Sequence, residues 1–228
     1  DTVILATATM AKQAREDASF FPLTVEYVEK MYASGKIPGG FFKRETRPSL
    51  TATLTSRLID RPLRPCFPEG LYRDIQVVTT VLSYDPNIAP ECLAINAASA
   101  AISISDIPFN GPVAAAYVCE VNGELLVNPP AELIKDSTLH LVVSGTEEAV
   151  LMIESEAKEV SEERILEAIQ LAHQSIKENI ALQKQLIAQV PCEKQDVVDP
   201  VNGDEYIDEI RGLVEQPIKD RMQSGISK

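Results

Sequence analysis

Hydrophobic and polar positions change their spacing several times along the chain, and each change marks a predicted element. The β-branched run at residues 2–9 predicts a buried strand. Alternation from Leu23 onward predicts a strand over 20–32 with one solvent-facing side. Residues 75–82 predict another strand, and the segment 91–105, which is rich in Ala and Ser and poor in charge, predicts a buried helix.

Turn residues predict two pairs of adjacent strands in the second half of the chain. Asn122-Gly123 is a strong hairpin signal, and Gly145-Thr146 separates a second pair. The four strands are expected at 113–121, 124–127, 139–144 and 149–154.

Cap residues and apolar spacing predict three further helices. The first begins at Ser49, which can cap it, and is expected to stop at Pro62. The second runs from about Ser161, its cap, to residue 189, and the third covers 206–222. The core-facing stripe of the second is expected to be Ile165, Ile169, Ala172, Ile176 and Ile180.

This order of elements predicts a mixed α/β fold with packed helices. It lacks the strict βαβ alternation of a doubly wound sheet, and no phosphate-binding glycine motif is present. We expect one domain over 1–190, a polar linker over 191–203 and the start of a helical domain over 204–228. No apolar run approaches the ~18 residues that a membrane span needs.

Charge is distributed unevenly along the chain. The formal net charge is −13, which taken alone argues against nucleic-acid binding. Between Lys36 and Arg73, however, eight Lys and Arg stand against three Asp and Glu, a local charge of +5, so the remainder carries −18. Any proposed function has to account for this basic zone in an otherwise acidic chain.

The first candidate motif, Gly39-Gly40-Phe41-Phe42-Lys43-Arg44, lies inside this basic zone. Two consecutive aromatic residues cannot both be buried by strand alternation, so at least one is expected to face outward beside the cations. Aromatic faces stack on bases and Lys or Arg hold phosphates, which is the chemistry of single-stranded RNA binding. The alternative is a hairpin whose Phe pair covers the edge of a core.

The second motif contains three arginines. Arg57 and Arg61 are one helical turn apart, and Arg64 follows Pro62. Three guanidinium groups near a helix end could hold consecutive phosphates. The alternative is a surface on which Asp60 and nearby acids pair with them.

Other polar residues offer weaker candidates. A group of acids could bind Mg²⁺, although a solvated helix start explains it better: Glu154, Glu156, Glu159, Glu162 and Glu163. We assign no catalytic role to His140 or His173 and predict no metal site. The cysteines lack zinc-ligand spacing and suit buried or semi-exposed thiols in a reducing compartment: Cys66, Cys92, Cys119 and Cys192.

These motifs together resemble the polynucleotide phosphorylase family. The resemblance is carried by the loop motif 37–45, by Arg47-Pro48-Ser49 and by the arginine motif 56–65, and it continues through 107–112 and 151–154 to about residue 190. It implies an RNase PH-type domain of the ribosomal-protein-S5 domain 2-like fold. The family's opening strands ahead of residue 1 are missing, so we expect an unpaired strand edge.

The resemblance also implies a function. Family members are cytoplasmic homotrimers that degrade single-stranded RNA from its 3′ end, with inorganic phosphate as co-substrate, and release nucleoside diphosphates. Their Mg²⁺ and catalytic residues lie on a second RNase PH-type domain, so this chain alone is expected to be inactive. Its RNA-binding residues would be Phe41, Phe42, Lys43, Arg44, Arg57, Arg61 and Arg64. Degradosome-type protein partners are possible, and no membrane is involved.

The sequence departs from the family pattern at three places. Lys43 stands where arginine is common, Thr46 where glycine is usual, and Asn96-Ala97 replaces a common Gly-Ala.

Two alternative functions stay open. They are a non-catalytic, exosome-like ring scaffold that binds RNA and a stand-alone RNase PH-type enzyme that trims tRNA. The second would need a phosphate site that we do not find in these residues.

Overall fold

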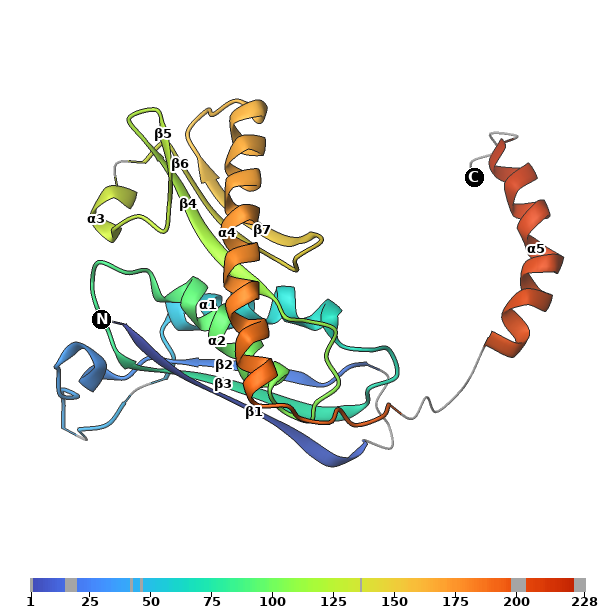
Figure 1. The fold of residues 1–228 in the computed structure, drawn as a ribbon, viewed down its shortest axis with the longest axis horizontal. Coiled ribbons are helices and arrows are strands. Elements are labelled where there is room, and N and C mark those ends of the chain that lie inside the picture. Colours follow the sequence, from blue (N-terminus) through green and yellow to red (C-terminus); the bar gives the residue numbers. More distant parts are fainter. Residues whose placement is uncertain are drawn as a thin grey trace.

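Four layers make up the fold: a sheet, a pair of helices, a second sheet and a long helix (Figure 1). The computed structural model describes residues 2–14, 20–41, 43–45, 47–135, 137–197 and 204–223. The predicted mixed α/β class with packed helices is confirmed.

The first sheet has three strands in the order β1-β3-β2. These are β1 (Val3–Ala14), β2 (Leu23–Val28) and β3 (Arg73–Ser83). β3 lies in the centre, antiparallel to β1 and parallel to β2. Two helices cover one face of this sheet, α1 (Leu50–Leu63) and α2 (Pro90–Ser103).

The second sheet is antiparallel, in the order β5-β4-β6-β7. Its strands are β4 (Ala114–Val121), β5 (Glu124–Val127), β6 (Leu139–Gly145) and β7 (Val150–Ala157). One face packs on α4 (Glu162–Gln189), and the other meets α2. The remaining elements are η1 (Met31–Ser34), η2 (Arg64–Cys66), α3 (Ala131–Ile134) and α5 (Asp204–Gln223).

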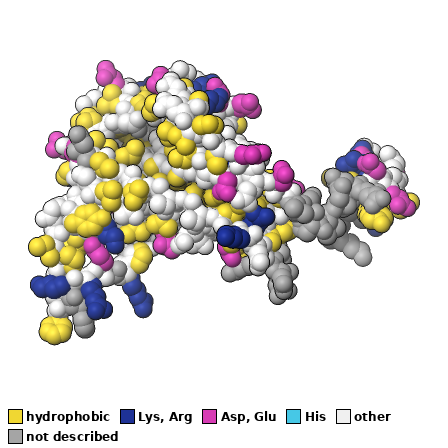
Figure 2. Space-filling model, turned by 60° about the horizontal axis from the view of Figure 1, so that its bottom comes forward, with side chains coloured by type: hydrophobic (Ala, Val, Ile, Leu, Met, Phe, Trp, Pro, Cys, Tyr) yellow, Lys and Arg dark blue, Asp and Glu magenta, His cyan; other side chains and the backbone are white. Residues whose placement is uncertain are grey.

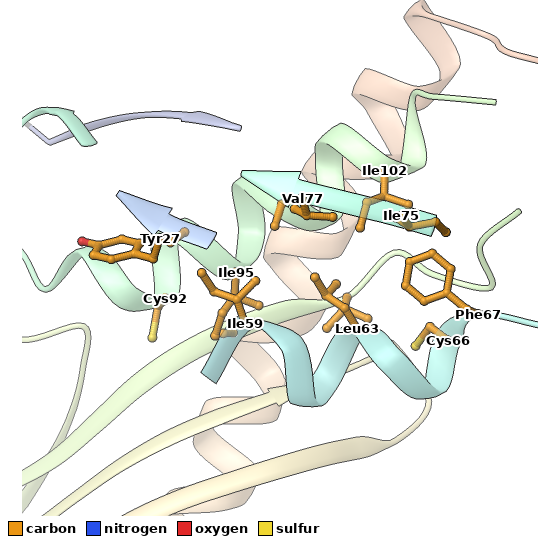
Figure 3. Packing of buried hydrophobic residues seen from close by; sticks show 14 of the residues in the cluster. Tyr27, Ile59, Leu63, Cys66, Phe67, Ile75, Val77, Cys92, Ile95 and Ile102 are labelled. Carbon is orange, nitrogen blue, oxygen red and sulfur yellow. The ribbon is translucent and has the colours of Figure 1, made fainter. Parts of the chain in front are cut away.

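Two hydrophobic clusters hold the layers together. The first lies between the first sheet and α1 and α2, where Ile59, Leu63 and Ile95 meet Val77 (Figure 3). The second lies between the second sheet and α4, and Ile176 is completely buried in it. Each helix therefore forms because its apolar face has a sheet to cover.

Several local predictions are confirmed. The Ser49 hydroxyl caps α1 by accepting the Ala52 N–H (2.9 Å), and the Ser161 hydroxyl caps α4 by accepting the Arg164 N–H (3.4 Å). Gly123 adopts a left-handed φ of 84° between β4 and β5, as a tight hairpin turn requires.

Other local predictions were wrong in their details. β1 is a strand but not a buried one: it lies at a sheet edge, and Val3 and Leu5 are about half exposed. The strand predicted over 20–32 is shorter, because η1 begins at Met31. Pro62 lies inside α1 instead of ending it, since its missing N–H removes only one hydrogen bond in the last turn.

The core stripe of α4 also differs from the prediction. Ile165 and Ile169 are only partly buried, whereas Ala168 and Gln183 join the buried positions. The stripe is displaced because it follows the surface of β4 and β6 along the helix.

Residues that follow α4 pack against the first half of the fold. The Lys194 ammonium donates to the carbonyl oxygens of Ile102 (3.0 Å), Ser103 (3.0 Å) and Ser105 (2.7 Å), at the end of α2. Val197 contacts the first hydrophobic cluster. α5 begins beyond them, and no helix within the described ranges is long and apolar enough to cross a membrane.

The packing of α4 gives a stability prediction. Ile176→Ala should lower the free energy of unfolding by about 2–5 kcal/mol, because it leaves a cavity against the second sheet. Leu182→Ala is the matched control, since Leu182 is 64% exposed on the same helix and should change stability by less than ~0.5 kcal/mol. Chemical denaturation followed by circular dichroism measures both, and equal effects would contradict the assigned core.

Candidate nucleic-acid interface

The loop over 36–49 joins η1 to α1 and projects from one end of the molecule (Figure 1). Gly40 and Lys43 adopt left-handed φ values of 75° and 51°, which turn the chain back. The Glu45 carboxylate accepts the Met31 N–H (3.2 Å) and ties the loop to η1. Lys43 and Arg44 are both exposed.

Phe41 faces outward, as the sequence predicted for at least one of the two aromatic residues. Its side chain is 93% exposed, the highest exposure of any large hydrophobic residue among those described. An exposed aromatic ring next in sequence to cations has the residue types that stack on bases and hold phosphates. Phe42 and Thr46 lie outside the described residues.

Basic and apolar side chains gather around this loop. In Figure 2 several Lys and Arg side chains surround hydrophobic ones at the lower left, the side on which the loop lies in Figure 1. Acidic side chains are spread over the remaining visible surface. The basic zone of the sequence is therefore also basic in space.

The three candidate arginines lie along α1 and just after it, in three different environments. Arg57 is exposed and makes no hydrogen bond or ion pair with any part of the chain that the structure describes. Arg61 pairs with Glu154 on β7 (Nη1–Oε2, 2.7 Å), with side chains 56% and 60% exposed. An exposed pair of this kind contributes only about 0–1 kcal/mol, so a phosphate could replace Glu154 at little cost.

Arg64 has a structural role in addition to its charge. Its guanidinium makes a two-point contact with Asp60 (Nε–Oδ2, 3.0 Å; Nη2–Oδ1, 2.7 Å). It also donates to the carbonyl oxygens of Phe21 (3.1 Å) and Leu23 (3.3 Å) and lies over the Phe21 ring. Arg64 thus joins the end of α1 to the start of β2, at the opposite end of β2 from the loop.

A cavity of about 930 Å³ lies beneath the loop. Residues of β2, η1, the loop and the first turn of α1 line it, and Tyr84 and Glu91 close its other side. The sequence analysis did not identify this cavity. In the sequence, the feature that could have indicated the cavity was Tyr27, which places a hydroxyl at an inward position of a strand.

Two ionisable groups that line this cavity have shifted pKa values. Burial, followed by the nearby Glu91 charge, raises the pKa of Tyr27 and keeps its phenol protonated. Burial also raises the pKa of the Glu91 carboxyl. The cavity thus contains a phenolic donor and a carboxyl group that is less readily ionised than usual.

The acids near α4 do not form a metal site. Glu154 pairs with Arg61, and the Glu156 carboxylate is hydrogen-bonded to His140 (Oε2–Nε2, 3.0 Å). His140 also contacts the Tyr117 hydroxyl (2.9 Å). No group of three His, Cys, Asp or Glu side chains in the described ranges is placed to hold a metal ion.

The four cysteines differ in their exposure to solvent. Cys66, Cys92 and Cys119 are buried, Cys192 is exposed, and all four are free thiols. Burial raises the pKa of the Cys66 thiol, so this group is protonated and unreactive at neutral pH.

Comparison with known proteins gives the class to which this fold belongs. The model of the 3′ exoribonuclease family, domain 1, matches residues 1–108, and that of domain 2 of the same family matches 111–175. The chain belongs to the 3′ exoribonuclease family, and its two-sheet structure agrees with the RNase PH-type fold.

Within that class, the chain is similar to polyribonucleotide nucleotidyltransferases. The chain is 54% identical to the polyribonucleotide nucleotidyltransferase of Syntrophomonas wolfei. The alignment spans 205 residues, which is 90% of this chain and 29% of the relative. It is 51% identical to that of Geobacillus kaustophilus and 49% identical to that of Natranaerobius thermophilus, each over 98% of this chain and 31% of the relative. The chain thus spans about 30% of the length of the curated relatives it matches.

The contacts of Arg64 predict that it stabilises the fold. Arg64→Ala should lower the free energy of unfolding by about 1–2 kcal/mol, because it removes the Asp60 contact and two carbonyl hydrogen bonds. Arg57→Ala, in α1, should change it by less than ~0.5 kcal/mol. Urea denaturation of both variants measures the difference, and no loss in Arg64→Ala would mean that these contacts do not contribute.

Proposed function

We propose that this chain is the RNA-holding part of a phosphorolytic 3′→5′ exoribonuclease. The observation that carries the proposal is the 93% exposed Phe41 beside Lys43 and Arg44, on a loop of a 3′ exoribonuclease-family fold. Phe41 and Phe42 stack on bases, and Lys43, Arg44, Arg57 and Arg61 hold phosphates. Arg64 adds positive charge while it holds α1 against β2.

The reaction of the whole enzyme follows from this class. Inorganic phosphate attacks the phosphorus of the last phosphodiester, the bond from that phosphorus to the penultimate 3′ oxygen breaks, and a nucleoside diphosphate leaves. The reverse reaction extends the strand. Such transfers depend on holding the strand in line and on neutralising charge, which arginines supply without covalent chemistry.

The division of labour is part of the proposal. In this proposal the catalytic residues and Mg²⁺ belong to a second RNase PH-type domain. This chain comprises the first such domain over 1–190, a linker over 191–203 and the start of a helical domain over 204–228. The parent protein is a cytoplasmic homotrimer around an RNA channel, open to degradosome-type partners.

RNA binding tests the proposal directly. Phe41→Ala should weaken binding of a fluorescent oligoadenylate about 5-fold or more, because one stacked base is lost. Arg57→Ala should weaken it several-fold and reduce the salt dependence, because one phosphate contact is lost. Fluorescence anisotropy at several salt concentrations measures both quantities.

Matched substitutions control for changes unrelated to the loop. Phe20→Ala replaces another exposed phenylalanine (65% exposed), and Arg211→Ala replaces an exposed arginine on α5. Neither should alter binding. Affinity that is insensitive to salt, or equal losses in the Phe41 and Phe20 variants, would overturn the RNA-holding role.

Phosphorolysis tests the division of labour. The 228-residue chain with Mg²⁺, inorganic phosphate and poly(A) should release no ADP, and adding the second core domain should restore release. ADP from this chain alone would place a complete active site within it. RNA binding without restored activity would favour the non-catalytic scaffold.

A further inference from the structure

The edge strands of the two sheets differ in how well their outer edges are protected. Within the described ranges these strands are β1 and β2 in the first sheet and β5 and β7 in the second. An edge strand presents backbone N–H and C=O groups that can pair with a strand of another molecule. Short length, charged side chains, proline or a covering element normally prevents such pairing.

Three of these edge strands carry such protection. β5 has only four residues, and β7 carries two glutamates. β2 has six residues, and side chains of the α1 region occupy part of its outer edge. Arg64 donates to the Leu23 carbonyl oxygen (3.3 Å), and the Ser56 hydroxyl accepts the Tyr27 N–H (2.9 Å).

β1 has none of these protections. With 12 residues it is the longest edge strand described, and its segment 3–11 contains neither a charged residue nor a proline. It forms the lower border of the first sheet in Figure 1, and the edge that faces away from β3 has no strand partner among the described residues. Ile4, Ala8 and Met10 pack against the first hydrophobic cluster but stay only partly buried. The edge of β1 is therefore open to solvent.

This edge is complementary to itself. Thr7 is the middle residue of the uncharged segment 3–11, so a two-fold axis at Thr7 places this segment antiparallel to the same segment of a second copy over its whole length. Ile4 of one copy then lies opposite Met10 of the other, on the side of the core. Because the pairing joins even positions with even ones, apolar side chains remain on the core side in both copies.

We propose that the edge of β1 pairs antiparallel with β1 of a second copy of this chain. The two three-stranded sheets then become one continuous sheet, and the two-fold contact is closed, so assembly stops at a dimer. Lys12 of each copy lies opposite Thr2 of the other, so no like charges face each other across the axis. The inference goes beyond the RNA-holding role, because β1 contains none of the residues proposed to hold RNA.

The size of the contact sets its expected strength. At ~3.4 Å per residue, the paired segment 3–11 is about 30 Å long. Such a line of contact buries less than the ~1,600 Å² of a standard interface, so the dimer should form at micromolar concentrations. Backbone hydrogen bonds between the two strands supply most of its affinity.

Sedimentation velocity of the 228-residue chain tests the proposal. As the concentration rises, the mass should increase from 25.0 kDa toward twice that value. Thr7→Lys should raise the dissociation constant of the dimer about 10-fold or more, because it places two ammonium groups at the axis. Thr24→Lys is the matched control and should leave dimerisation unchanged, since Thr24 is an exposed threonine on β2, at the opposite edge of the same sheet.

Disulfide trapping tests the predicted register. Thr7→Cys in a Cys192→Ser background should give a covalent dimer on mild oxidation, because the two introduced thiols face each other at the axis. The three remaining native cysteines are buried, so they do not compete. Thr24→Cys in the same background should stay monomeric under the same conditions.

The outcomes distinguish this contact from other assemblies. A monomer at every concentration overturns the proposal, as does a dimer that Thr7→Lys leaves intact. A trimer overturns it as well, since three copies need a ring contact instead of a two-fold pair. If circular dichroism shows that Thr7→Lys does not fold, disulfide trapping decides. Because Phe41→Ala should leave the dimer unchanged, failure of the RNA-holding role and failure of this contact give different results.

Discussion

The backbone at the start of β4 is the point on which both halves of the fold depend. The Val113 N–H donates to the Ser99 hydroxyl (2.8 Å), and the Val113 carbonyl accepts from the Gln183 side chain (2.9 Å). Two residues further, the Ala115 N–H donates to Asn96 Oδ1 (2.8 Å). These groups lie where α2, α4 and the second sheet meet, and side chains satisfy them because a buried backbone group without a partner is costly. The Asn96 side chain thus supplies the acceptor that the Ala115 N–H needs.

This junction fixes the helix layer, and the helix layer fixes the candidate site. α1 packs beside α2 and against β2, so the position of Ser49 at its first turn follows from the core. The Ser49 side chain both caps α1 and contacts Glu29 at the end of β2. At the other end of the loop, Gly35 and Lys36 donate to carbonyl oxygens of η1 (2.9 Å each). Because both ends are held, the residues between them can project into solvent without loosening the fold, and the cavity below keeps its shape.

Local features of the fold were predictable from the sequence, and long-range contacts were not. Spacing and caps identified α4 with its Ser161 cap and the hairpin at Asn122-Gly123, because these depend on residues near in sequence. Spacing could not show that β1 lies at a sheet edge, because its burial depends on β3, about 70 residues away. The candidate site likewise has features that depend on neighbours in sequence and features that depend on distant residues. An outward-facing aromatic ring followed from the consecutive pair Phe41-Phe42, whereas the Arg61–Glu154 pair joins residues 93 positions apart. The cavity escaped prediction because β2, η1, α1 and α2 build it together.

Charge placement resolves the conflict between an acidic chain and an RNA-binding role. At physiological ionic strength a charge is screened beyond about 8 Å, so the net −13 of the chain matters less than the charges near a bound strand. Within the basic zone, Asp60 neutralises Arg64, and Glu154 opposes Arg61 only weakly in solvent. Lys36, Lys43, Arg44 and Arg57 then provide the local field, all on α1 or on the loop before it. The remainder of the chain carries a net −18 and is less favourable for a polyanion than this zone. For the proposed RNA-holding role, uneven charge therefore favours the approach of the strand at the basic zone, where the exposed Phe41 ring can stack on a base.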